Sequence, residues 1–299
     1  MDISRNNQST WGWQIAAYLF SAGMGAGAYS FSCYLKLVPS LDQNDIALRG
    51  MWIGTVVTAF SVSFLILDLG KPIRFLRVLV NVTHSWLSRG AVILTTFCIL
   101  ALATIFSGEV TALVWLSLAL AIAVATYTGI LLGTMLSRPL WNNSLLPVIF
   151  LTSALSTGIG LLDVGGTITA IGNSSTLHAI ESAITNLRWI HVLLLVAELI
   201  MLYFYLNLSY FRSEQAVHAL IKGNLRNKFW LGIIGIGIII PIIVLTSTQG
   251  LHGAIESILL IVSDLCVLLG GFMLRRLVLY VGTRNAVELG VRFVIRSEI

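Results

Sequence analysis

Long apolar runs alternate with short polar segments along almost the whole chain, which predicts a bundle of membrane-spanning helices. Each run is close to the roughly 20 residues that an α-helix needs to cross a bilayer. Eight runs are present, at residues 13–38, 51–69, 90–107, 111–136, 145–164, 189–210, 229–248 and 255–281. The pattern therefore predicts an all-α integral membrane protein with eight transmembrane helices. Its longest loops would be 165–188 and 211–228, and 108–110 would be a very tight link.

The composition supports a membrane protein without a separate soluble domain. The chain is 57% hydrophobic and only 10% charged, whereas soluble domains are about 25% charged. We therefore expect one integral membrane domain over residues 1–299. The first apolar run is too long for a cleavable signal peptide and lacks a short charged start, so we expect it to be retained. The net charge of +5 does not indicate nucleic-acid binding, because the basic residues are spread over the loops.

The basic residues distinguish the two sides of the predicted bundle. Loops after successive spans alternate between side A, which carries both termini, and side B. Side B has three of the 18 lysines and arginines, namely Lys36, Arg49 and Arg188. The other fifteen fall on side A. This number includes Arg275 and Arg276, which lie near the end of the last span. This asymmetry supports the eight-span interpretation and places side A in the cytoplasm by the positive-inside rule.

Cysteines and histidines argue against metal cofactors within the chain. Cys33, Cys98 and Cys266 lie singly in apolar segments, so we expect no iron–sulfur or zinc site and no other metal site. A haem b in a membrane bundle usually has two axial histidines. Only His191 falls clearly within or near a span. We therefore expect no haem.

One group of polar residues lies near side A. Gln14 and Tyr18 begin the first span on one helix face, Asp68 ends the second, and Tyr127 lies in the fourth. Hydrogen-bonding groups in an apolar wall suit a quinone headgroup, which needs partners for its carbonyls and a nearby proton donor. Other interpretations are interfacial anchoring for Gln14 and Tyr18, a local ion pair for Asp68, and helix–helix hydrogen bonding for Tyr127.

A second polar group lies toward side B and the membrane midplane. It comprises Asp163, His191, Glu198 and Asp264. His191 and Glu198 are seven residues apart, so they project from one helix face two turns apart. Acid and imidazole groups stepping inward are typical of a proton path. The alternative is a set of structural pairs between helices.

Three stretches of the first half resemble the NrfD/polysulfide reductase membrane subunit family. They are "WGWQIAAYLFSAGMGAGAY" (11–29), "DLGKPIRFLRVLVNVTHSWLSRGAV" (68–92), and "YTGILLG" (127–133) with the "RPLWN" that follows (138–142). The family pattern is D-L-G-[RK]-P-x-R-F followed by S-W-x-x-R-G at the start of span three. The second half resembles the family only in architecture.

The resemblance implies a membrane subunit of a respiratory oxidoreductase in a prokaryotic cytoplasmic (inner) membrane. Such a subunit exchanges electrons between a menaquinone or ubiquinone pool and a ferredoxin-like iron–sulfur subunit, often joined to a molybdopterin or multihaem catalytic subunit. It also implies two four-helix bundles, 1–164 with the quinone site and 165–299. If the family's quinone site is carried over by position, the quinone would contact the following residues: Gln14, Tyr18, Asp68, Gly70 and Tyr127.

The resemblance also suggests a role for the basic residues after the second span. Lys71, Arg74, Arg77 and Arg89 would form a collar for an acidic iron–sulfur protein, although ordinary positive-inside charge also explains them. The family often carries its redox partner outside the cytoplasm, opposite to the charge rule. Two other functions remain as alternatives: a proton-coupled secondary transporter using the membrane acids, and a purely structural anchor.

Overall fold

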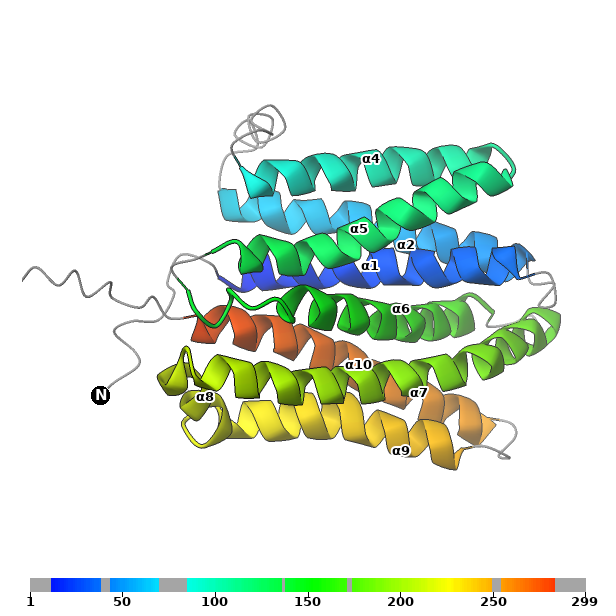
Figure 1. The fold of residues 1–299 in the computed structure, drawn as a ribbon. Coiled ribbons are helices and arrows are strands. Elements are labelled where there is room, and N and C mark those ends of the chain that lie inside the picture. Colours follow the sequence, from blue (N-terminus) through cyan, green and yellow to red (C-terminus); the bar gives the residue numbers. More distant parts are fainter. Residues whose placement is uncertain are drawn as a thin grey trace, which may run out of the picture.

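The computed structural model describes residues 12–38, 44–69, 85–135, 138–170, 174–248 and 254–282. The regular secondary structure in these ranges is helical, and the long helices lie side by side with their axes along one direction (Figure 1). This confirms the predicted all-α class. The first half contributes α1 (Trp13–Leu37), α2 (Asn44–Leu69), α4 (Trp86–Phe106) and α5 (Thr111–Gly133).

The second half adds four long helical segments and one short helix. α8 (Glu214–Ile221) is short and packs at the side-A end of the bundle (Figure 1). A π-helix, η3 (Lys228–Ile239), continues directly into α9 (Ile240–Ser247), and together they form one span. The remaining helices are α6 (Leu146–Ala170), α7 (Ser174–Tyr210) and α10 (Ala254–Val281).

Seven helical segments of the described chain are long and apolar enough to cross a membrane. The first predicted span, 13–38, coincides with α1, which has 25 residues but is less apolar than these seven segments. Eighteen of those residues are buried. A helix surrounded by other helices has little contact with lipid, so its sequence can be rich in Gly, Ser and Ala. The outward faces of the other helices carry large apolar residues such as Phe106, Leu193 and Leu269.

Helix α1 lies at the centre of the bundle because small residues let its backbone approach its neighbours. It packs against α2, α5, α6 and α10. A Cβ atom added at Gly27 would collide with the Ala154 carbonyl of α6, and one added at Gly158 would meet the backbone of Gly27 and Ala28. Close backbone approach of this kind drives helix association inside membranes.

Gly158→Ala is therefore expected to destabilise the bundle. Its methyl group has no space against the α1 backbone, and overpacking of this kind costs about 1–3 kcal/mol. The variant should lose its folded, monodisperse form in detergent at a lower temperature than the natural protein. Gly133→Ala is the matched control, since the nearest atom to its added Cβ would be the Trp141 carbonyl oxygen at 3.9 Å. Equal thermal stability of the two variants would contradict the close α1–α6 crossing.

The connection between α5 and α6 is fixed to the end of α10. The Arg138 guanidinium donates a hydrogen bond to the Gly282 carbonyl and stacks on Trp141, with its carbon 4.4 Å from the ring centroid. Trp141 in turn donates from Nε1 to the Val278 carbonyl at 2.7 Å. The "RPLWN" motif thus holds the two halves of the chain together at side A.

The structure confirms one of the predicted connections between helices and contradicts another. The link at 108–110 is confirmed as a tight turn, with Gly108 at φ +75° and Glu109 at φ 60°, and the Glu109 carboxylate pairs with Lys36 at the end of α1. The predicted long loop 165–188 is wrong. α6 continues to Ala170 and α7 begins at Ser174, because helix-compatible polar residues extend both helices beyond their apolar runs.

Candidate functional site

Tyr127 of α5 is the central residue of the side-A group. It is 3% exposed, and its hydroxyl has no hydrogen-bond partner among the described residues. A buried polar group left unpaired costs about 1–3 kcal/mol. Tyr18 of α1, also buried, is close enough to interact with Tyr127 electrostatically. The arrangement presents a phenolic donor within an apolar wall, as a bound polar ligand would require.

Helix α4 seats the Tyr127 ring through Gly90. A Cβ atom at Gly90 would overlap the ring carbons and the hydroxyl of Tyr127, so only glycine permits this approach. The start of α4 is fixed by Ser85, whose Oγ accepts a hydrogen bond from the Ser88 amide at 3.4 Å. The "SWLSRG" segment thus serves as a helix start that brings glycine to the tyrosine.

The other predicted quinone-site residues are only partly described. Gln14 is partly buried, and its amide oxygen lies back toward Gly12 at the start of α1. Asp68 belongs to α2, but its side chain lies outside the described part of the structure. Gly70 also lies outside the described residues. The structure therefore brings together Tyr18 and Tyr127 and leaves the role of Asp68 a prediction.

Of the four residues in the predicted basic collar, the structure describes only Arg89. The Arg89 guanidinium carbon lies 4.7 Å from the centroid of the Trp86 ring at the side-A end of α4. Lys71, Arg74 and Arg77 lie outside the described residues. The docking role of the collar thus remains a prediction.

Three of the four predicted proton-path residues meet at one point. Asp163 of α6, His191 of α7 and Asp264 of α10 are buried, and one carboxylate or imidazole atom from each lies within 4.8 Å of those from the other two. His191 Nδ1 lies 3.9 Å from Asp264 Oδ1. Both imidazole nitrogens and both Asp264 oxygens lack hydrogen-bond partners among the described residues. Such a cluster has unused capacity to exchange protons or to hold water.

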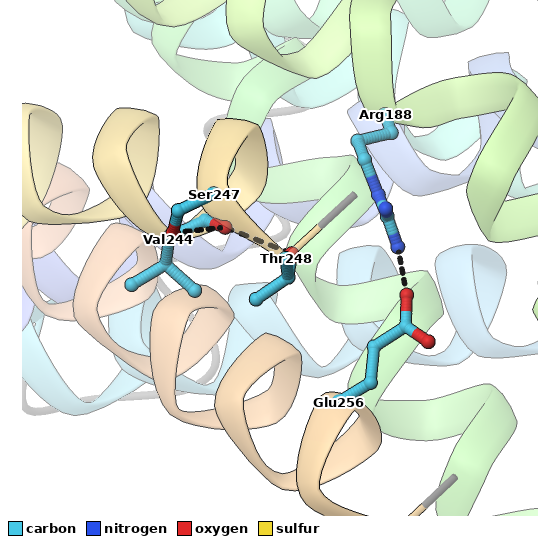
Figure 2. A network of polar contacts seen from close by, with 5 residues as sticks. All are labelled: Arg188, Val244, Ser247, Thr248 and Glu256. Atoms are coloured by element: carbon cyan, nitrogen blue, oxygen red, sulfur yellow. Dashed lines mark hydrogen bonds and ion pairs between the residues drawn. The ribbon is translucent and has the colours of Figure 1, made fainter. Parts of the chain in front are cut away.

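An arginine lies between this cluster and side B. The Arg188 side chain is 7% exposed, and Nη2 donates to Glu256 Oε1 at 2.8 Å. Figure 2 shows the pair joining α7 to the first turn of α10, near the end of α9. Arg188 also interacts electrostatically with Asp163 and Asp264. Among the described residues, this ion pair lies between the cluster and side B.

Glu198, the fourth predicted residue, lies apart from the cluster. It is two turns farther along α7 than His191, a rise of about 10.5 Å. Ser153 of α6 and Arg275 of α10 are near enough to interact with it electrostatically. A charged side chain at the centre of a membrane helix costs about 3 kcal/mol. The opposite charge of Arg275 offsets part of this cost for Glu198.

The cluster is also the place where the described residues could hold a metal ion. One imidazole and two carboxylates are suitable ligands for a divalent cation. The Arg188 guanidinium already supplies a positive charge beside both carboxylates. The electrostatic demand for a metal ion is correspondingly smaller.

Arg275 is the functional candidate that the sequence analysis missed. It was counted with the side-A loop charges, yet it is completely buried. Its position was the available signal, since it falls six residues inside the predicted end of the last span. Intramembrane arginines are rare enough to mark functional sites by default.

Comparison with known proteins gives a match along nearly the whole sequence. A family model described as "Polysulphide reductase, NrfD" matches residues 2–285. A polysulfide reductase chain of Wolinella succinogenes is 29% identical, over 94% of this protein and 96% of the relative. Protein NrfD of Escherichia coli is 28% identical, over 91% and 94%. A selenate reductase subunit of Mesobacillus selenatarsenatis is 24% identical, over 88% and 71%.

Proposed function

Because the chain belongs to the polysulphide reductase NrfD family, we propose that it is the quinone-reactive membrane subunit of a respiratory oxidoreductase. It would exchange electrons between menaquinone or ubiquinone and an iron–sulfur partner subunit. Two of the relatives are single components of a polysulfide reductase and of a selenate reductase, which supports a role within a larger enzyme. Its apolar helices support the multi-pass membrane location.

The unpaired Tyr127 hydroxyl is the observation that carries the quinone assignment. A quinone carbonyl accepts hydrogen bonds, and a quinol must release two protons as its electrons leave. A phenol in an apolar wall can donate to the first and relay for the second. Tyr18 and Gln14 on α1 and Asp68 at the end of α2 would complete the site from the neighbouring helices.

Eight spans in two bundles are the architecture that fits this function. The buried α1 would be the eighth span and would form the first bundle with α2, α4 and α5. α6 contacts α1 and α5 but also α7 and α10. We therefore place the boundary between the bundles in the connection before α6, rather than at residue 164. The first bundle would carry the quinone site.

The iron–sulfur partner would dock on side A, above Tyr127. Electron tunnelling requires its cluster to lie close to the quinone, and Arg89 at the side-A end of α4 would contribute to the docking surface. The partner would in turn connect to a molybdopterin or multihaem catalytic subunit. The charge distribution favours a cytoplasmic side A in a bacterial inner membrane.

Isolation of the protein from its native membrane in mild detergent tests the partner assignment. The expected result is co-purification of a subunit that carries iron and acid-labile sulfide, together with quinone. The catalytic subunit that accompanies it would identify the terminal substrate. A protein that purifies alone under conditions that preserve other respiratory complexes would contradict the proposal.

The second bundle would move protons during turnover. Asp163, His191 and Asp264 would receive protons from side B, past the Arg188–Glu256 pair, and Glu198 would be the inner end of the path. Because these groups lie on other helices than Tyr127, their proton movement is a separate function from quinol oxidation.

Glu198→Gln separates these two functions. The substitution keeps the size and hydrogen-bonding capacity of the side chain but removes its titratable proton. We expect quinol oxidation within about twofold of the natural rate, because Tyr127 is untouched, and loss of the protons carried across the membrane. The ratio of protons moved to electrons transferred in sealed vesicles is the measurement. An unchanged ratio in the variant would rule out a path through Glu198.

Proton-coupled transport is the second candidate function, and the Asp163–His191–Asp264 cluster favours it. The cluster is built from three helices of the second half and does not require a quinone. Vesicles that contain this protein alone distinguish the two functions. A transporter would couple a proton gradient to solute uptake without any redox partner, whereas the quinone-reactive subunit would show no such uptake.

A further inference from the structure

The cluster on helices α6, α7 and α10 consists of metal-ligand side chains that the described residues leave largely unbonded. Asp163, His191 and Asp264 are at most 6% exposed, and one ligand atom from each lies within 4.8 Å of the other two. Both imidazole nitrogens and both Asp264 oxygens have no hydrogen-bond partner among the described residues. Buried polar atoms without partners are costly, so the cluster favours a ligand that bonds to all three side chains at once.

The formal charges around the cluster indicate a cation with two charges. Arg188 lowers the demand for a cation, but its Nη2 is already paired with Glu256 Oε1 at 2.8 Å, so this pair adds no net charge. With His191 neutral, the two ionised aspartates leave a formal charge of −2 on the cluster. A divalent cation cancels this charge in full, and burying a neutral assembly costs far less than burying a charged one.

We propose that Asp163, His191 and Asp264 form a binding site for a divalent transition-metal ion of the Zn²⁺ type. Such ions accept imidazole nitrogen and carboxylate oxygen together, at bond lengths of about 2.0–2.2 Å, whereas Mg²⁺ and Ca²⁺ prefer oxygen ligands alone. Ligand atoms around a tetrahedral ion with such bonds lie about 3.4 Å apart. The three side chains therefore need to approach one another by no more than about 1.4 Å. Three protein ligands leave one coordination position for water.

Helix α6 leaves space for that water beside Asp264. Gly160 lies one turn before Asp163 on the same face of α6. A Cβ atom added at Gly160 would have three atoms of Asp264 as its nearest neighbours, at 3.4–3.6 Å, and Oδ1 is one of them. These are ordinary van der Waals distances, so one more atom fits between the two helices here. An ion reaches the cluster from side B past Glu256, whose side chain is 19% exposed.

A bound ion has two consequences for the second half of the chain. It holds α6, α7 and α10 together, and it occupies the atoms that would otherwise take up protons. Only the second consequence rests on the proposed proton path, since the site itself requires neither a quinone nor turnover. The ligands come from three helices far apart in the sequence, which is why the lack of a CxxC motif gave no indication of them.

The test measures the binding of radioactive Zn²⁺ to the complete chain, purified in mild detergent, stripped with a chelator and kept in excess Mg²⁺. We expect one tightly bound Zn²⁺ ion per chain. His191→Gln and Asp264→Asn each remove one ligand with little change in size. They should weaken binding by at least about 100-fold, because loss of even an outer-shell partner costs about 10–100-fold. His218→Gln is the matched control, since it removes an exposed imidazole on α8 and should leave binding unchanged.

X-ray absorption by the Zn²⁺-loaded natural chain keeps the proposal testable even if a variant fails to fold. The expected spectrum shows one imidazole and two or more oxygen ligands at about 2.0–2.2 Å. A natural chain that binds no Zn²⁺, full binding in both folded ligand variants, or a spectrum with sulfur or several imidazoles would overturn the proposal. Failure of the quinone assignment or of the proton path would change none of these readings, so the failures are distinguishable.

Discussion

Tyr127→Phe is expected to abolish most quinol oxidation while the protein folds normally. The ring that packs against Gly90 is retained, so the helices lose no buried apolar surface. The hydroxyl that would donate to the quinone and relay its proton is removed. Loss of a positioned acid–base group typically lowers the rate by about 10²–10⁴-fold. Steady-state quinol oxidation by the isolated complex, together with its quinone content, measures the effect.

Tyr29→Phe is the matched control for this experiment. Tyr29 is also a buried tyrosine, on α1 toward side B, but its hydroxyl already donates to Ser117 Oγ at 3.0 Å. Its removal should cost some stability and leave quinol oxidation within about threefold of the natural rate. Equal losses of activity in the two variants would indicate a general packing defect. Full activity of Tyr127→Phe would remove the tyrosine from the quinone site.

Gly90→Ala is expected to have the second large effect, because its methyl group would occupy the position of the Tyr127 ring. The ring must move away from α4, and the hydroxyl then leaves the side-A site. We expect a fall in quinol oxidation of at least about 10²-fold, similar to Tyr127→Phe, accompanied by lower thermal stability. The paired measurements are turnover and the temperature at which the purified complex aggregates.

The combination with Tyr127→Ala shows whether Gly90 acts through the tyrosine ring. Removing the ring creates space for the new methyl group, so the Gly90→Ala/Tyr127→Ala double variant should lose less stability than the two single variants lose together. Activity should not return, since the phenol is absent. A double variant whose loss of stability equals the sum of the two single losses would contradict direct contact between the two positions.

Much of the fold was predictable because the membrane imposes a simple rule on sequence. A lipid-facing helix must be apolar over its length, so runs such as 111–136 and 255–281 identify α5 and α10. The rule describes α1 less well, since a helix enclosed by other helices can be rich in Gly and Ser. It also does not describe helix beyond the membrane, which is why the residues at the start of α7 were predicted as loop.

The residues of the candidate sites could be predicted from the sequence, but not which of them contact one another. Sequence identifies a rare intramembrane acid or imidazole, and it identified Asp163, His191, Glu198 and Asp264. It does not fix the relative rotation of three helices, which decides that Asp163 and Asp264 meet His191 while Glu198 lies apart from them. The packing of Tyr127 against Gly90 was equally unpredictable. Gly90 has no side chain to suggest a role, and its importance depends on the distance between α4 and α5.

Labelling with a photoreactive quinone tests the central claim most directly. The complex would be illuminated with an azido-quinone, digested, and the labelled peptides identified by mass spectrometry, with and without excess unlabelled quinone. The account predicts competable labelling within α1, α4 and α5 around Tyr18, Gly90 and Tyr127, and its loss in Gly90→Ala. Labelling confined to outward-facing residues of α7 or α9, or labelling that excess quinone does not reduce, would contradict a quinone site in the first bundle.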